Sequence, residues 1–397
     1  MKETINMLHL SSLGIWDLGQ NKGRASTYLP LKGFVDRGHI VHFITIDKRH
    51  KTENIDGINF EQVRLPIYPI PKKRLHNLTR LILLPITTIC LFFSVLKRYK
   101  KNKPDVIYSH STETAVAAYF LAKRFKSKYV LRLYGFPKFK KETFLYKILK
   151  LDRTLSLLLK ADLYILTNDG TGADKAVESF GISKDKIHFL KNGIDKSYIN
   201  RPIDNLLKKK LTPNQEKIIL SVSRLVNWKQ VDLIIMAIPS ILEKEKNIKL
   251  IVVGDGVERK NLESLVQKLN IEKHVYFTGA IEQNLVVDYI KIADLFISMN
   301  ALSGMNNPVF EAMICGKSVI ALNTGDTKNL IKDNETGILL DPSKIGELSK
   351  VILDILRDDV KRGKIGTNAQ RFMNEEWPSW DDRVNYEIDL IEKFIFN

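Results

Sequence analysis

The sequence predicts an α/β protein with two parallel-sheet domains. Short apolar runs typical of strands alternate with amphipathic helical patterns along most of the chain, which is the order found in parallel α/β sheets. The pattern restarts once, after residues 201–217. The 397 residues, 44% of them hydrophobic, are also too many for one ordinary core and suggest two domains of about 200 residues each.

The strands can be placed from the apolar runs in order. The first half contains candidates at 5–10, 40–46, 58–63, 105–110, 129–134, 163–167 and 187–190. The second half contains candidates at 217–222, 248–254, 275–279, 295–299 and 318–322, with amphipathic helices such as 231–245 between them. Residues 201–217 carry Pro202, Pro213 and three consecutive lysines, so we interpret them as the linker between the domains.

Cysteine usage and the N-terminal residues narrow the class of protein. Cys90 and Cys315 are the only cysteines, which excludes a disulfide framework and a cysteine zinc site. The first residues, MKETINMLHLSSLG, lack the basic start, apolar run and small-residue cleavage site of a secretory signal. We therefore expect a cytoplasmic protein.

The charge is concentrated in the first half. Residues 1–210 carry 39 Lys and Arg against 18 Asp and Glu, a net +21, whereas residues 211–397 carry a net −4, in agreement with the total of +17. A basic half of this kind can face nucleic acid, an anionic membrane or an anionic substrate. Nucleic acid is disfavoured because no RNA-binding aromatic signature, zinc finger or basic zipper occurs. A solvated lysine-rich surface remains the alternative.

Polar residues after the second-half strands indicate a phosphate site. Arg224 and Lys229 follow the strand at 217–222 and precede a helix that starts near Val231. Two cations beside a helix N-terminus are suited to a diphosphate. Gly254 and Asp255 follow the next strand; this is a weak signal, because turns between strands and helices need glycine in any case.

Glu311 stands in an otherwise apolar stretch. Asn307 is expected to cap a helix whose first residue is Pro308, which places Glu311 about one turn in. A carboxylate there can accept two hydrogen bonds from a vicinal diol such as that of ribose. The alternative is an exposed first-turn glutamate favoured by the helix dipole, worth about 0.3–1 kcal/mol. The loop before this helix can approach a ligand closely and contains Ser303, Gly304, Met305 and Asn306.

Five ordered blocks between residues 221 and 340 resemble the nucleotide-sugar domain of the retaining family 4 glycosyltransferases, which have the GT-B fold. The blocks are SRLVNWKQVDLIIMA, IVVGDGVERKNLESL, VYFTGAI, NPVFEAMICGKSVIA and NETGILL. The first half resembles the family more loosely, through VDRGHIVHFIT, PDVIYSHS, LTNDGT and KNGID. The end of the chain, with Trp380 and Arg383, resembles the family's helix that returns to the first domain.

The resemblance implies that the two domains bind different substrates. Residues 1–205, with the returning helix at 375–397, would bind the acceptor, and residues 206–374 the nucleotide sugar. Arg224 and Lys229 would hold the donor diphosphate, and Glu311 the ribose hydroxyls. Other donor contacts would come from Gly23, Gly254, Asp255, Gly279, Ala280, Ile281, Ser303, Gly304, Met305, Asn306 and Asn307. The acceptor or sugar side would include His110, Tyr134, Asp169 and Asn192.

Two positions depart from the family. Its pattern of two glutamates separated by seven residues places the first at Ser303, and its first-domain histidine falls at Tyr134. Both residues can still hydrogen-bond sugar hydroxyls, so a change in sugar preference is expected. A non-catalytic binding subunit and a nucleotide-sugar epimerase remain alternatives.

The expected reaction is a retaining transfer of a hexosyl or N-acetylhexosaminyl group. The leaving phosphate can act as base while Arg224 and Lys229 stabilise its charge. No Asp-x-Asp pair occurs, so neither a metal nor another cofactor is expected.

Two segments suggest a lipid-linked glycan or surface polysaccharide as acceptor, of the capsule, exopolysaccharide or lipopolysaccharide type. Residues 81–96 are apolar but short for a membrane span, and a buried helix is the alternative. Residues 136–160 form a basic amphipathic pattern, with core packing as the alternative. Phe144, Ile148, Leu151, Leu155 and Leu158 share its apolar face. We expect peripheral association with the inner face of the cell membrane.

Overall fold

The computed structural model describes residues 4–12, 25–47, 51–64, 76–135, 151–167 and 169–396. The chain divides into two compact units. Unit 1 comprises Met1–Asn168, Gly172–Asn192 and Asp381–Asn397, and unit 2 comprises Asp169–Thr171 and Gly193–Trp380. The domain limits inferred from the sequence, at 205/206 and 374/375, stay a prediction.

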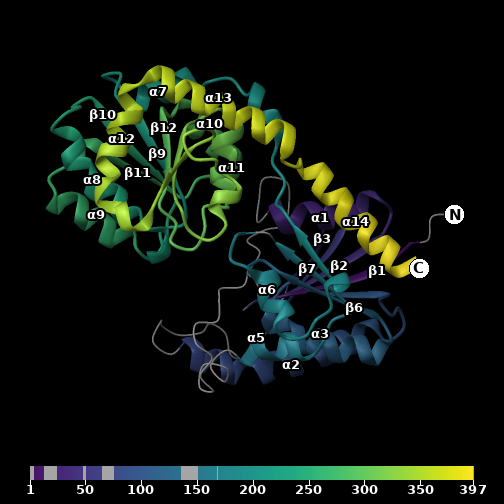
Figure 1. Cartoon of the computed structure of the whole chain (residues 1–397). Helices are drawn as coiled ribbons and strands as arrows, with labels where there is room; N and C mark the ends of the chain where they lie inside the picture. Colours follow the sequence, from purple (N-terminus) through teal and green to yellow (C-terminus); the bar gives the residue numbers. More distant parts are fainter. Residues whose placement is uncertain are drawn as a thin grey trace. The chain divides into compact units, whose positions relative to one another are not determined.

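Unit 1 contains an eight-stranded sheet in the order β3-β4-β2-β1-β5-β6-β7-β8. Figure 1 labels five of these strands, β1, β2, β3, β6 and β7. All neighbouring strands are parallel except β3 and β4. The strands are β1 (Asn6–Ser11), β2 (Ile40–Asp47), β3 (Lys51–Ile55), β4 (Ile58–Arg64), β5 (Val106–Ser109), β6 (Lys128–Leu133), β7 (Leu163–Thr167) and β8 (Ile187–Leu190). The helices are α1 (Ala25–Asp36), α2 (His76–Tyr99), α3 (Thr112–Phe125), α5 (Leu151–Leu158), α6 (Ala173–Glu178) and α14 (Trp380–Phe396).

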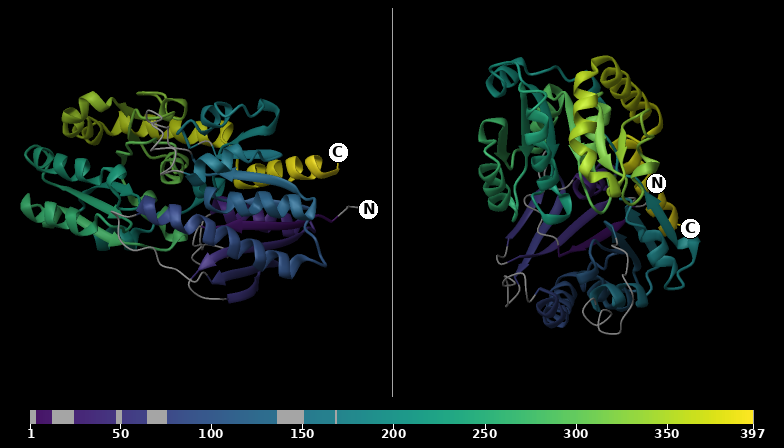
Figure 2. Two further views of the ribbon diagram at one scale, coloured as in Figure 1. Left: turned by 90° about the horizontal axis from the view of Figure 1, so that it is seen from below. Right: turned by 60° about the vertical axis from the view of Figure 1, so that its left-hand side comes forward.

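Both faces of this sheet are covered, because alternate strand residues point to opposite sides. Leu8 and Leu10 of β1 share a core with buried residues of α2, α3 and α5. Met7 shares the opposite core with buried residues of α1 and α14. Helix α14, the yellow C-terminal helix, therefore completes the second layer and lies along α1 (Figure 1 and Figure 2).

Unit 2 contains a six-stranded parallel sheet in the order β11-β10-β9-β12-β13-β14. Its strands are β9 (Lys217–Val222), β10 (Ile248–Val253), β11 (Val275–Gly279), β12 (Leu295–Ser298), β13 (Val319–Leu322) and β14 (Ile338–Leu340). One face packs against α8 (Val231–Leu242), α9 (Arg259–Lys268) and α12 (Leu348–Arg357). The other packs against α10 (Gln283–Ile292), α11 (Asn307–Ile314) and α13 (Asp359–Glu376).

The predicted fold class is confirmed, and each strand expected from the sequence is present. The structure adds β3, an exposed edge strand whose sequence KTENI lacks an apolar run. It also places helix α7 (Asn205–Leu211) in the stretch interpreted as a linker. The Asp204 carboxylate caps this helix at the backbone N–H of Leu207 and Leu211 is buried, so part of the stretch is helical. Its role as a linker stays a prediction.

None of the helices in the described ranges combines the length and the hydrophobicity of a transmembrane helix. In α2, Leu91 and Val95 are buried in the core, whereas Ile89 and Phe93 are 55% and 61% exposed. Helix α2 is therefore neither a span nor wholly buried. It is an amphipathic helix with some apolar side chains left on its outer face.

Candidate active site

The two predicted phosphate-binding cations lie where β9 leads into α8. A short 3-10 helix, Asn227–Lys229, separates the strand from α8, and Gln230 turns the chain with a φ of 48°. Arg224 is exposed and Lys229 is partly buried. Burial, and then repulsion by Arg224, lowers the pKa of Lys229 to about 8. A bound anion would relieve both effects, which is the electrostatic property of a phosphate site.

The Gly-Asp-Gly turn supports this loop by close packing. A Cβ atom on Gly254, whose φ is 127°, would lie 2.0 Å from the Ser223 carbonyl oxygen, and one on Gly256 would lie 2.3 Å from that of Leu225. The backbone N–H of Leu225 donates to the Asp255 carbonyl at 2.9 Å. The glycines therefore hold the backbone on both sides of Arg224, as a turn rather than as a dinucleotide fingerprint.

A Gly254→Ala substitution tests this support. We expect destabilisation of unit 2 by more than the roughly 1–3 kcal/mol of a strained backbone conformation, because the added methyl also overlaps a backbone carbonyl. Urea unfolding followed by circular dichroism measures the change. Gly363→Ala in α13 is the matched control, since its added Cβ has no neighbour within 4 Å. Equal midpoints for the two variants would contradict the packing role.

The loops at this edge of the sheet are joined by backbone hydrogen bonds. Gly254 donates to the Gly279 carbonyl at 2.9 Å, and Ala301 donates to the Trp228 carbonyl at 2.9 Å. Ala280 and Ile281, predicted as donor contacts, follow directly after β11, with Ala280 exposed. The loops after β9, β10, β11 and β12 thus form one continuous surface in unit 2, as the parallel topology requires.

The loop before α11 is tightly bonded internally. Ser303 is buried, and its Oγ accepts the Met305 N–H at 3.0 Å. Gly304 donates to Thr327 Oγ1 at 2.7 Å. Helix α11 begins at Asn307 with Asn306 as its cap residue, so the predicted cap was wrong by one position. The extended backbone of Asn306, with φ −142° and ψ 154°, places the cap there.

Glu311 is buried, with 7% of its surface exposed, which rules out the alternative of an exposed dipole-favoured glutamate. Gln283 Nε2 donates to its Oε1 at 3.1 Å, whereas its Oε2 has no hydrogen-bond partner among the described residues. Burial, and then the negative charge of Asp195, raises the pKa of Glu311 to about 7. A buried carboxylate oxygen of this kind is costly unless a ligand donates to it.

In unit 1 the predicted residues His110 and Tyr134 are in contact. They follow β5 and β6, and His110 Nδ1 lies 2.7 Å from the Tyr134 hydroxyl. His9, on β1, bonds His110 from the other side at 2.9 Å, between His9 Nδ1 and His110 Nε2. His9 was not predicted from the sequence, although a histidine inside an otherwise apolar strand is a visible signal.

The remaining predicted residues are separate from this pair. Asp169 Oδ1 accepts hydrogen bonds from the Thr171 N–H at 3.0 Å and the Thr171 hydroxyl at 2.6 Å, in a local turn. Asn192 ends the second segment of unit 1. Gly23 lies outside the described residues. Within the described ranges, no group of three or more His, Cys, Asp or Glu side chains is arranged to hold a metal ion.

Known proteins resemble this chain along most of its length. The Bacillus anthracis N-acetyl-alpha-D-glucosaminyl L-malate synthase is 24% identical over 365 residues, covering 90% of each chain. The Campylobacter jejuni N-acetylgalactosamine-N,N'-diacetylbacillosaminyl-diphospho-undecaprenol 4-alpha-N-acetylgalactosaminyltransferase is 29% identical over 226 residues, 55% of this chain and 58% of that protein. The structure of Anabaena HepE with UDP and glucose matches with a TM-score of 0.73 at 18% identity, covering 98% of this chain and all of that chain, and shows a shared fold.

Two family models match the two halves in turn. The model described as Glycosyltransferase Family 4 matches residues 27–198, and the model described as Glycosyl transferases group 1 matches residues 202–372. The two matched ranges together cover most of both parallel-sheet units. The chain belongs to the group 1, family 4 glycosyltransferases and has their GT-B fold.

Proposed function

We propose that this chain is a retaining, metal-independent transferase. It moves a hexosyl or N-acetylhexosaminyl group from a nucleoside diphosphate sugar to a lipid-linked glycan or surface polysaccharide at the cytoplasmic membrane face. The observation that carries the proposal is the loop of Arg224 and Lys229, held by hydrogen-bonded neighbouring loops at the edge of the unit 2 sheet. The UDP and glucose bound to HepE and the undecaprenol-linked acceptor named for the Campylobacter relative support the substrate classes.

The cation pair supplies the main electrostatic contribution to this reaction. The bond between the sugar's anomeric carbon and the diphosphate oxygen breaks, and its electron pair moves to the diphosphate. Arg224 and Lys229 stabilise that charge. The acceptor hydroxyl oxygen forms the new bond to the anomeric carbon on the same face, and its proton passes to the leaving phosphate. No metal is required in this scheme, because Arg224 and Lys229 offset the charge that develops on the diphosphate.

Glu311 is the proposed ribose contact. Its Oε1 already accepts from Gln283, which orients the carboxylate. Its buried Oε2 has no hydrogen-bond partner among the described residues and would accept from a ribose hydroxyl. This assignment also explains why a carboxylate is retained on a buried helix face.

We expect Glu311→Ala to weaken nucleoside diphosphate binding by about 1–3 kcal/mol. Because the pKa of Glu311 is about 7 and only the ionised form accepts both hydrogen bonds, affinity should rise as pH increases from 6 to 8. Titration calorimetry of the wild type and Glu311→Gln measures both effects. The glutamine variant should lose the rise, and an unchanged affinity in Glu311→Ala would remove this residue from the site.

The function itself is tested with a panel of nucleotide sugars and a membrane extract, each with and without EDTA. Sugar transfer that EDTA leaves unchanged is expected. Donor binding without transfer or hydrolysis would favour the non-catalytic subunit, and conversion of the donor to its epimer would favour the epimerase. Activity lost in EDTA and restored by Mg²⁺ would contradict the metal-independent mechanism.

Membrane association is supported by α2. Pro85, Ile89, Phe93 and Lys97 are all exposed and recur every fourth residue, so an apolar stripe ends in a cation on one outer face. Leu158 of α5 is also 59% exposed, while Leu151 and Leu155 are partly buried. Phe144 and Ile148, predicted for the same amphipathic face, lie outside the described residues. Such a stripe, in the basic half of the chain, is suited to an anionic lipid surface.

We expect the wild type to sediment with anionic phosphatidylglycerol vesicles and less with neutral phosphatidylcholine vesicles, the difference shrinking at high salt. An Ile89→Ser/Phe93→Ser double variant should lose most of this binding, because the apolar contact is removed. Leu206→Ser, at a position 82% exposed on α7, is the control. Equal recovery with both lipids at both salt concentrations would reject the electrostatic attachment.

A further inference from the structure

Glu387 on α14 is a buried carboxylate surrounded by donors from the unit 1 sheet. Both of its oxygens accept from Arg132 Nη1, at 2.9 and 2.8 Å, and the Tyr108 hydroxyl donates to Oε1. Arg383, one turn earlier on the same helix, lies 2.6 Å from Oε2. Arg132 and Glu387 are 0% and 1% exposed, so this cluster is closed to water.

The cluster stays ionised at neutral pH. Burial alone would raise the pKa of Glu387, but the charges of Arg132 and Arg383 outweigh it and lower the pKa to about 2. Two guanidinium groups thus share one carboxylate. Buried ion pairs of this kind contribute little net stability compared with apolar packing, and their value lies in defining one arrangement of side chains.

Arg132 also contacts the ring of Tyr134. Its guanidinium carbon lies 4.8 Å from the centre of the Tyr134 ring, a cation–π contact that holds the ring plane. The Tyr134 hydroxyl lies 2.7 Å from His110 Nδ1 and 2.9 Å from Thr27 Oγ1. The ring is therefore held on its face by Arg132 and at its hydroxyl by two side chains.

The hydrogen bonds also define which way the Tyr134 hydroxyl points. Burial lowers the pKa of both His9 and His110, so each ring is neutral and has a single N–H. His9 Nε2 has no hydrogen-bond partner within the described residues. At this position an unprotonated nitrogen without a partner costs less free energy than a buried N–H without one, so the proton of His9 is on Nδ1. His9 Nδ1 therefore donates to His110 Nε2, and His110 Nδ1 donates to the Tyr134 hydroxyl. The Tyr134 O–H then donates to Thr27 or to a ligand.

We propose that Glu387 and Arg132 are positioning residues that hold Tyr134 as a hydrogen-bond donor to a sugar hydroxyl, so that α14 sets sugar preference. The inference rests on the proposed function and deepens it. The ionised cluster fixes Arg132, Arg132 fixes the ring, and the hydrogen bond from His110 directs the hydroxyl proton of Tyr134 away from the histidines. Tyr134 thereby selects an acceptor oxygen on the sugar.

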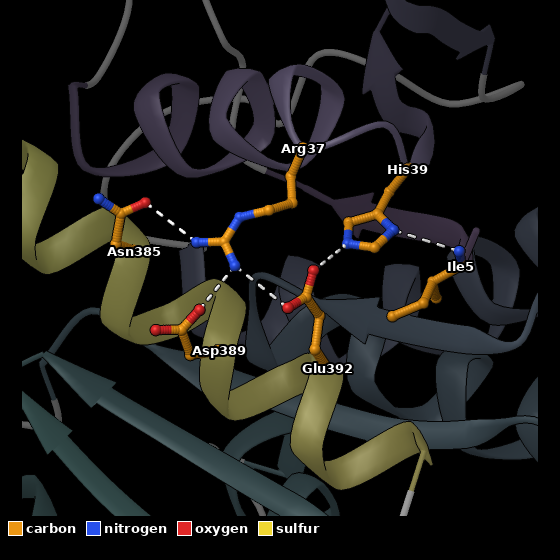
Figure 3. Close-up of polar contacts among 6 residues, drawn as sticks. All are labelled: Ile5, Arg37, His39, Asn385, Asp389 and Glu392. Atoms are coloured by element: carbon orange, nitrogen blue, oxygen red, sulfur yellow. Dashed lines mark hydrogen bonds and ion pairs between the residues drawn. The ribbon is translucent and has the colours of Figure 1, made fainter. Parts of the chain in front are cut away.

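The same helix offers a matched control. Glu392 accepts from Arg37 at 3.1 Å and pairs with His39 at 2.9 Å (Figure 3). His39 Nδ1 accepts the Ile5 N–H, so its Nε2–H donates to Glu392. Glu392 therefore anchors α14 to unit 1 as Glu387 does, but it has no hydrogen bond or ion pair to Arg132 or Tyr134 among the described residues.

The test compares Glu387→Gln, Glu392→Gln, Tyr134→Phe and the double variant Glu387→Gln/Tyr134→Phe. Steady-state kinetics would use the preferred donor and its analogue with one sugar hydroxyl inverted. Glu387→Gln should lower kcat/KM at least tenfold and change the ratio between the donors at least threefold, with calorimetric Kd for the nucleoside diphosphate unchanged. Glu392→Gln should change neither quantity by more than twofold. In the Tyr134→Phe background, Glu387→Gln should add less than a twofold effect.

Independent, multiplicative effects of Glu387→Gln and Tyr134→Phe would overturn the inference while leaving the transferase intact. Equal effects of Glu387→Gln and Glu392→Gln would do the same, because helix anchoring would then explain both. A wild type that turns over no donor would instead reject the proposed function, and the positioning role with it. Circular dichroism of each variant identifies any that is unfolded, and Arg132→Lys then replaces Glu387→Gln with the same expected pattern.

Discussion

Replacement of Lys229 by methionine is expected to lower kcat/KM for the nucleotide sugar by about 10²–10³, the scale for losing one fixed charge that stabilises a developing anion. The methionine keeps most of the side-chain volume and removes the cation. Steady-state kinetics with the preferred donor measures the loss. Lys244→Met is the control, because Lys244 is an exposed cation just after the same helix, α8. Equal kinetics for the two variants would exclude Lys229 from the reaction.

The pH dependence provides a second readout of Lys229. Burial, followed by repulsion from Arg224, lowers the pKa of Lys229 to about 8, so the free enzyme loses this charge as pH rises through 8. We expect kcat/KM to fall on that alkaline side. Lys229→Arg should retain charge and lose the fall up to at least pH 9, since arginine stays protonated. An alkaline fall that persists unchanged in Lys229→Arg would assign the titration to another group.

Glu387→Ala is expected to destabilise unit 1 by about 3–5 kcal/mol at pH 7, the cost of leaving buried guanidinium groups without their carboxylate. Urea unfolding, with hydrogen exchange of the β5 and β6 amides to locate the effect, measures it. Glu392→Ala should cost much less, because Glu392 is 22% exposed and its partner Arg37 keeps its ion pair with Asp389. Equal losses in the free energy of unfolding would show that the burial of Glu387 does not increase its contribution to stability.

We also expect the folded protein to lose stability in acid because of Glu387. Its folded pKa of about 2 lies below the ordinary value of 4.5, so the contribution to stability is complete above pH 4.5 and is lost as pH falls toward 2. Glu311 acts in the opposite sense. Its folded pKa of about 7 lies above 4.5, so stability falls as pH rises from 4.5 to 7. Glu311→Gln should therefore be more stable than the wild type at pH 8. The proposed ribose contact explains why the wild type keeps a residue that lowers its stability.

The parallel-sheet architecture could be predicted because buried strands such as 217–222 and 248–254 are nearly uninterrupted apolar runs. Strand β3 could not, since an exposed edge strand needs no apolar run and is defined by its pairing with β4. Helix α7 was missed for a different reason. Its lysines and flanking prolines are typical of a linker, and the burial of Leu211 that stabilises the helix is seen only in the structure.

The candidate site also contains residues that the sequence predicts and contacts that only the tertiary structure reveals. Residue type and local spacing were enough to indicate Arg224, Lys229 and Glu311, because a cation pair before a helix and a carboxylate one turn into another are local patterns. The burial of Glu311 against Gln283, and its shifted pKa, depend on packing between α10 and α11. The series of contacts from His9 through His110, Tyr134 and Arg132 to Glu387 joins residues up to hundreds of positions apart, and no local pattern could reveal it. The sequence determines which chemical groups are present and their local spacing. Their desolvation and their hydrogen-bond partners depend on distant segments packing together in the tertiary structure.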